Sequence, residues 1–228
     1  MIEKVYSTAL LCIAGLLIYL ALPRFIASTE ALYSDIVIEQ LHHTGQYPSV
    51  DVYLNAYKHL DNALEWVDDS IYWHQLSQLK IKNFIANADD AVAVDDVISD
   101  LHATTQIALV LMPVAPFTWY DLALIESMHQ ETRANALKAV MMSVYVDRVN
   151  PNLLKPRVLF LWEQIDVLDG ELHAAFNAQL LLLWQLRKNE LVEVVNRFPE
   201  IKGSIRGLLL NSPSELEQLT KVLSKRKY

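Results

Sequence analysis

Apolar residues recur at helical spacing through most of the chain, and prolines or polar clusters mark the breaks between the periodic runs. Ten runs are long enough to predict helices. They cover residues 30–43, 50–67, 70–86, 91–112, 116–130, 132–148, 152–168, 171–188, 189–198 and 213–225. Helices joined by short loops pack as antiparallel neighbours, so the pattern predicts an all-α protein built from antiparallel helical pairs.

Two runs carry the clearest one-sided stripes, which indicate helices packed on a neighbour. The first stripe consists of Leu137, Val140, Met141 and Val144, and the second of Leu154, Val158, Leu161, Trp162, Ile165 and Leu168. The run Leu180–Trp184 is apolar all round, so we expect a core helix with neighbours on several sides. Proline disrupts a helix interior, so Pro156 predicts that the second striped helix begins near Lys155. Gly203 and Gly207 leave the stretch after Pro199 without a predicted helix.

An apolar run also opens the chain. Residues Val5 to Leu22 read VYSTALLCIAGLLIYLAL, 18 residues without a charge, with Lys4 before them and Pro23-Arg24 after them. This length meets the lower bound for a helix that crosses the hydrocarbon core of a bilayer. The same layout is typical of a cleaved secretory signal, and a buried core helix is a third interpretation.

The residues around the possible cleavage positions favour an uncleaved anchor. Ala21 and Ala27 have Tyr19 and Phe25 two positions upstream, where signal peptidase requires a small side chain. We therefore expect a single-pass membrane anchor over residues 1–28 and a soluble helical-repeat domain over residues 29–228. Lys4 and Arg24 nearly balance under the positive-inside rule. The signal-like layout favours a body outside the cytoplasm, which is the periplasm if the anchor lies in a bacterial inner membrane.

Composition narrows the function classes. The formal net charge of −8 gives the body no electrostatic footprint for nucleic acid, so we expect no nucleic-acid partner. The low count of 5 Gly and 8 Pro disfavours a turn-rich β protein. Cys12, which lies inside the apolar run, is the single cysteine. An intrachain disulfide and a CxxC site are therefore excluded.

A short internal repeat follows the pattern W-x-x-L-small. Its two copies begin at Trp73 and Trp119, 46 residues apart. They resemble the first helix of a tetratricopeptide repeat (TPR), in which a tryptophan and a leucine face the paired helix and a small residue lets the two backbones approach. The resemblance implies a TPR-like, α-solenoid fold in which the repeat-packing residues are Trp73, Leu76, Ser77, Trp119, Leu122 and Ala123. The resemblance is specific over residues 115–151, where Ala136, Ala139 and Pro151 also fit. Elsewhere it is degenerate, because the 46-residue separation of the two copies exceeds the TPR period of about 34 residues.

A second resemblance covers residues 113–169. The phrases APFTWYDLALIES and MMSVYVDRVNPNLLKPRVLFLWEQIDVLD are similar to those of small single-span proteins encoded in bacterial exopolysaccharide and O-antigen gene clusters. This resemblance implies a setting in cell-surface polysaccharide biosynthesis or export.

No residue pattern predicts an active site. The seven histidines lack the H-x-x-x-H or H-E-x-x-H spacing of a metal site, and the paired aspartates lack the glycine of a calcium loop. The soluble part contains no G-x-S-x-G, no glycine-rich phosphate loop and no nucleophilic cysteine. We therefore expect no enzyme activity, no cofactor and no metal.

The sequence instead favours an interaction protein. Trp66, Tyr72 and Trp73 lie close together on predicted helices and form a possible partner-binding groove, although tryptophans at this spacing are more often core residues. We expect a membrane-anchored scaffold that binds a protein partner. The alternatives are a structural subunit of a larger membrane complex and an enzyme that acts on glycans or peptidoglycan.

Overall fold

The structure, a computed structural model, describes residues 2–44, 49–86, 94–128 and 130–224. Within these ranges 11 α-helices are present and no strands, and most neighbouring helices within each unit pack against each other. The all-α prediction is confirmed. The chain divides into two compact units, Met1–Pro113 and Val114–Tyr228.

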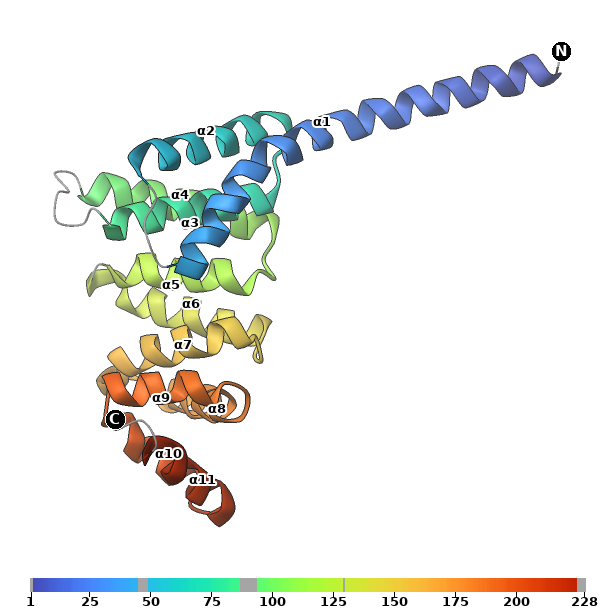
Figure 1. The fold of residues 1–228 in the computed structure, drawn as a ribbon. Coiled ribbons are helices and arrows are strands. Elements are labelled where there is room, and N and C mark those ends of the chain that lie inside the picture. The colour runs from blue at the N-terminus through green and yellow to red at the C-terminus, as the bar shows by residue number, and fades with distance from the viewer. Residues whose placement is uncertain (1, 45–48, 87–93, 129, 225–228) are drawn as a thin grey trace. The chain divides into compact units, whose positions relative to one another are not determined.

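The N-terminal unit contains four helices, coloured blue to green in Figure 1: α1 (Ile2–Thr44), α2 (Val50–Trp66), α3 (Ser70–Ala86) and α4 (Val94–Leu111). α1 packs on α2 and α3, α2 packs on α3, and α3 packs on α4. The turn between α2 and α3 has only three residues, so these two helices run antiparallel.

α1 joins two segments that the sequence pattern separates. The predicted anchor and the predicted helix over residues 30–43 form one continuous helix with Pro23 in its interior, and the predicted boundary at residues 28/29 falls within it. An interior proline removes one backbone hydrogen bond and bends a helix without having to end it. Figure 1 shows α1 changing direction where it meets the rest of the unit, and its N-terminal part extends away alone.

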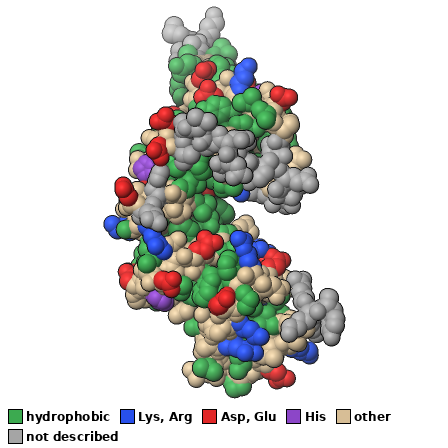
Figure 2. All heavy atoms as spheres, turned by 90° about the vertical axis from the view of Figure 1, so that its left-hand side faces the viewer, with side chains coloured by type: hydrophobic (Ala, Val, Ile, Leu, Met, Phe, Trp, Pro, Cys, Tyr) green, Lys and Arg blue, Asp and Glu red, His purple; other side chains and the backbone are tan. Residues whose placement is uncertain are grey.

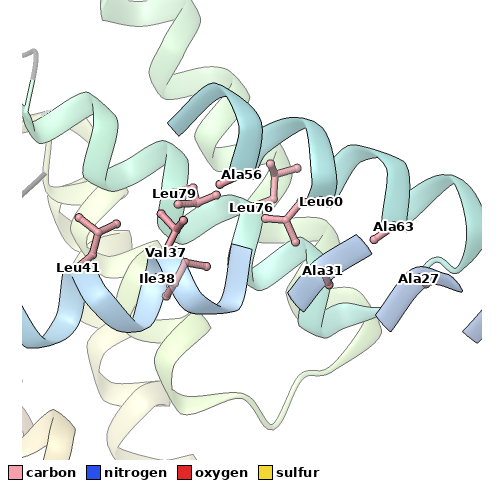
Figure 3. Close-up of a cluster of buried hydrophobic side chains, with 10 residues drawn as sticks. All are labelled: Ala27, Ala31, Val37, Ile38, Leu41, Ala56, Leu60, Ala63, Leu76 and Leu79. Carbon is pink, nitrogen blue, oxygen red and sulfur yellow. The ribbon is translucent and has the colours of Figure 1, made fainter. Parts of the chain in front are cut away.

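The C-terminal half of α1 contributes to the core of the N-terminal unit. Small residues on α1 and α2, among them Ala27, Ala31, Ala56 and Ala63, allow the two helices to approach closely. Figure 3 shows the whole buried cluster, which consists of Ala27, Ala31, Val37, Ile38, Leu41, Ala56, Leu60, Ala63, Leu76 and Leu79.

The C-terminal unit contains seven α-helices and two short 3₁₀ helices within the described residues. They are α5 (Pro116–Ser127), η2 (Gln130–Thr132), α6 (Arg133–Val146), α7 (Pro151–Glu163), η3 (Ile165–Val167), α8 (Gly170–Leu186), α9 (Lys188–Arg197), α10 (Ile201–Leu208) and α11 (Pro213–Ser224). α5 packs on α6, and α7 packs on α8 and α9.

α8 is the central helix of this unit, as its apolar sequence predicts. It contacts α6, α7, α9 and α10, and Leu180, Leu183 and Trp184 are fully buried. The Trp184 indole N–H donates to Glu215 of α11 at 3.2 Å. The two predicted stripes are also confirmed, since Val140 of the first and Leu161 of the second are buried.

Two details of the sequence prediction are wrong. α7 begins at Pro151 rather than near Lys155, because the Asn150 side chain caps the first turn by accepting from the Asn152 backbone N–H at 3.1 Å. Pro156 is tolerated inside the helix at the loss of one hydrogen bond. α10 was not predicted, and it forms despite Gly203 and Gly207 because Ile201 and Ile205 on one face are fully buried. Residues 91–93 and Lys225, the ends of two predicted helices, and His129 lie outside the described residues.

The packing of α1 on α2 can be tested with an enlarged side chain. Ala56→Leu places three extra carbon atoms into a fully buried site, so the N-terminal unit is expected to lose about 1–3 kcal/mol of stability. Hydrogen exchange of the full chain in detergent micelles should show faster exchange in α1 and α2. Asn55→Leu, at the exposed neighbouring position, is the control and should leave exchange unchanged.

The two α10 glycines give a prediction of opposite sign. Nothing lies within 4 Å of a Cβ added at Gly203 or Gly207, so alanine fits at both positions. Each Gly→Ala replacement is expected to stabilise α10 by about 0.5–1 kcal/mol, because alanine loses less backbone entropy in a helix. Slower hydrogen exchange in α10 is the readout, and unchanged or faster exchange would contradict the assignment.

Candidate functional site

The three residues of the predicted groove lie at the turn between α2 and α3. Trp66 is the last residue of α2, and Tyr72 and Trp73 lie in the first turn of α3. Trp66 is 49% exposed, whereas Tyr72 and Trp73 are partly buried and pack against the core cluster of the N-terminal unit. Trp66 is therefore the member of the trio that is most available to a partner.

Two aspartates fix the shape of this turn. Asp69 accepts a hydrogen bond from the Ile71 backbone N–H at 2.9 Å and so satisfies one of the unpaired donors at the start of α3. Asp68 accepts from the Trp73 indole N–H at 2.6 Å. These two adjacent acids thus hold the turn and the Trp73 ring in one arrangement.

The turn also lies beside α1. The Tyr72 hydroxyl is 3.4 Å from the Ser28 hydroxyl. Further along, Glu30 bonds His59 Nδ1 at 2.7 Å and Ser34 donates to the Ala56 carbonyl at 2.7 Å. These contacts run in opposite directions along the two helices, so α1 and α2 are antiparallel. In Figure 3, Ala27 accordingly lies at the same end of the cluster as Ala63, and Leu41 lies at the other end.

The two copies of the W-x-x-L-small pattern occupy similar environments. Leu76 and Ser77 are buried at the face of α3, and Leu122 and Ala123 are buried at the face of α5. The Ser77 hydroxyl lies 2.5 Å from the Thr105 hydroxyl of the paired helix α4. Both tryptophans, Trp73 and Trp119, are half-buried. Each copy thus begins the first helix of a packed pair, α3 with α4 and α5 with α6.

The C-terminal unit holds a buried arginine that the sequence analysis missed. Arg157 of α7 is 0% exposed. Its guanidinium donates to the Asp147 carbonyl at 2.8 Å, to the Ser143 carbonyl at 2.5 Å and to the Ser143 hydroxyl at 2.9 Å. The Ser143 hydroxyl in turn donates to the Pro116 carbonyl at 2.6 Å. One buried network therefore links α5, α6 and α7.

The acceptors of this network identify its role. The carbonyls of Ser143 and Asp147 lie at the C-terminal end of α6, where the helix dipole is negative. The Ser143 carbonyl also accepts the Asp147 backbone N–H at 3.4 Å, the last hydrogen bond of the helix. Burial lowers the pKa of Arg157 to about 10, so the side chain stays charged at neutral pH. Burial raises the pKa of Tyr120, whose hydroxyl remains a donor and bonds the Pro156 carbonyl at 3.3 Å. Because all three guanidinium nitrogens already bond the protein, the arrangement holds helices together and offers no reactive group.

Two lysines form ion pairs between neighbouring helices. Lys80 bonds Asp100 at 2.7 Å, and Lys155 bonds Glu193 at 2.6 Å. Across the described part of the chain, no three His, Cys, Asp or Glu side chains are grouped to hold a metal ion. Figure 2 shows acidic, basic and hydrophobic side chains interspersed over one face, without a large patch of a single kind there.

The buried arginine can be tested by removing its donors. Arg157→Met conserves much of the side-chain volume but removes the buried donors to the Ser143 and Asp147 carbonyls and to the Ser143 hydroxyl, so a loss of about 3 kcal/mol in the free energy of unfolding is expected. Urea unfolding of the full chain in micelles measures it. Arg157→Lys keeps the charge but not the planar fork, so it should be intermediate. A stability equal to wild type in both variants would refute the structural role.

Comparison with known proteins identified no relative of this chain. No family model matches the chain, and no curated protein matches it. The structure alone therefore shows what kind of protein this is, an all-helical arrangement of neighbouring packed pairs in the described residues. Within the described residues, one helix, over Leu10–Leu41 of α1, is long and apolar enough to cross a membrane.

Proposed function

We propose that this protein is a non-enzymatic, membrane-anchored scaffold that holds a TPR-like helical body at a membrane surface and presents it to a protein partner. The observation that carries the proposal is the double role of α1. Its N-terminal half is apolar and exposed, and its C-terminal half is part of the core of the N-terminal unit.

The exposed half of α1 has the properties of a membrane span. Large apolar side chains from Leu10 to Leu22 are each at least half exposed, with no protein partner in the unit. Transfer of one such side chain out of water is favourable by about 1.5–3 kcal/mol, so exposure of the whole run to water is strongly unfavourable. Eighteen helical residues measure about 27 Å, close to the thickness of the hydrocarbon core.

The connection between span and body supports positioning as the function. Ala27, fully buried in the core, follows Leu22 after only five residues of continuous helix. There is thus no linker that lets the body diffuse away from the bilayer. Confinement of this kind raises the local concentration of a binding surface without any new contact. Because Ala27 is inside the core, the structure also favours a span that stays attached.

Other features bear on the alternatives. The buried Arg157 and Tyr120 are used between helices, which favours a scaffold over an enzyme that acts on glycans. The two W-x-x-L-small copies support a TPR-like body, whose surfaces typically receive a partner's helix or extended segment. A bacterial inner membrane, a periplasmic body and a role in exopolysaccharide or O-antigen production are proposed from the sequence resemblance and the signal-like layout.

The anchor is tested by placing a charge in the middle of the run. Ile13→Arg puts a guanidinium near the bilayer centre at a cost of about 3 kcal/mol, so alkaline carbonate is expected to extract a larger fraction of this variant than of wild type. Wild-type protein and the Ile13→Leu control should remain in the membrane fraction. The body should fold alike in all three, because Ile13 is exposed and outside the core.

Three results would count against the proposal. Extraction of the wild-type protein by carbonate would show that it has no membrane anchor. A mature protein whose N-terminus follows Ala21 or Ala27 would show that the apolar run is a cleaved signal. If an unrelated apolar helix in place of residues 5–22 abolishes crosslinking to the partner, the span itself recognises another subunit. A reporter fused at Tyr228 and active on only one side of the membrane determines the orientation.

A further inference from the structure

The hydrogen bonds between α1 and α2 fix which residues of the two helices lie at the same level. Glu30 is level with His59, and Ser34 is level with Ala56. Both helices rise about 1.5 Å per residue, so in an antiparallel pair each step back along α1 matches one step forward along α2. Continuing either contact places Trp66 level with Pro23 and Arg24.

Pro23 and Arg24, the α1 residues at the level of Trp66, directly follow the end of the apolar run. Leu22 is the last residue of the charge-free segment, so Trp66 lies only about 3 Å beyond it along the axis. The headgroup region on each side of the hydrocarbon core is about 5–7 Å thick. If α1 spans a bilayer, the side chain of Trp66 falls within that region.

Aromatic residues mark both ends of the same span. Phe25, 71% exposed, lies on α1 at the level of Trp66, and Tyr19, 75% exposed, lies about one and a half turns before it. Tyr6, 68% exposed, lies near the other end. The separation between Tyr6 and the level of Trp66 is about 27 Å, close to the hydrocarbon thickness, and tryptophan and tyrosine are enriched at both membrane–water interfaces.

The turn that carries Trp66 is held against α1. Tyr72 contacts Ser28, and Ile71, 53% exposed, lies beside it at the start of α3. Asp68 and Asp69 are engaged in fixing the turn. Trp66 and Ile71 are therefore apolar side chains on a rigid turn, next to the point where α1 leaves the body.

We propose that the α2–α3 turn rests in the headgroup layer of the bilayer that α1 spans, with Trp66 as an interfacial anchor at the same level as Phe25. The inference rests on the proposed membrane span and adds a second attachment of the body. Together, the span and the turn fix the tilt and rotation of the N-terminal unit relative to the membrane.

The chemistry of the turn selects the bilayer interface rather than anionic lipid. Recognition of anionic headgroups requires clustered Lys and Arg, whereas the N-terminal unit has 14 Asp or Glu and 5 Lys or Arg, and the turn itself carries Glu65, Asp68 and Asp69. An indole ring, by contrast, is favoured at the interface because one end is apolar and the other polar. Seating of the turn should therefore occur in zwitterionic lipid and gain nothing from anionic lipid.

The test uses a fluorescent probe at three positions of the full chain reconstituted in phosphatidylcholine vesicles. In a Cys12→Ala background, Trp66→Cys, Phe25→Cys and Val50→Cys are each labelled with the same environment-sensitive fluorophore. Quenching is measured with nitroxides attached either near the headgroup or deep in the acyl chain. Val50 is the matched control, because it is 72% exposed and lies on the same helix about 24 Å from Trp66.

We expect the probes at Trp66 and Phe25 to be quenched more by the shallow nitroxide than by the deep one, and the probe at Val50 by neither. Quenching at Trp66 should not increase when anionic lipid is added. Quenching at Phe25 but not at Trp66 would overturn the seating of the turn and leave the anchor intact. Absence of quenching at both would overturn the anchor as well. Protection of the Trp66 probe from both nitroxides and from aqueous iodide would assign the turn to a protein contact instead.

Discussion

The structure depends on one helix that must satisfy two different environments. The first half of α1 has apolar side chains around its whole circumference, which suits a hydrocarbon solvent, and the second half buries one face against α2 and α3. The change between the two occurs within a few residues, between Leu22 and Ala27. Because the backbone stays helical through Pro23, whatever holds the first half also positions the second.

Buried polar contacts fix the packing where apolar contacts alone would allow sliding. Ser34 on the Ala56 carbonyl sets how far α1 lies along α2, and Arg157 on the end of α6 sets α7 against α6. Apolar faces are tolerant of register because burial is non-directional. A buried donor without its acceptor is costly, so each such contact selects one arrangement. Both units use this device, at the α1–α2 contact and within the α5–α7 group.

The packing of α1 on α2 also relates an aromatic residue of α1 to one at the end of α2. Trp66 and Phe25 are 41 positions apart in sequence, and only the register of α1 on α2 brings them to one level. The N-terminal unit is joined to the apolar half of α1 by continuous helix, with the α2–α3 turn held beside it, so the two have little freedom to reorient relative to each other.

The sequence by itself determined the helical class, most helix positions, the apolar N-terminal half of α1 and the burial of α8, because hydrophobic periodicity and length are local properties. It failed where tertiary contacts override local preference. Asn150 capping and packing carry α7 past Pro156, burial of Ile201 and Ile205 forms α10 despite two glycines, and α1 continues through Pro23. Arg157 lies on the stripe of Leu154 and Leu161, but the sequence does not show that it is buried. Its burial depends on the carbonyls at the end of α6, which only the tertiary structure places beside it. The level of Trp66 on α1 also came only from tertiary structure, because helix register is set by hydrogen bonds between residues that the sequence does not pair.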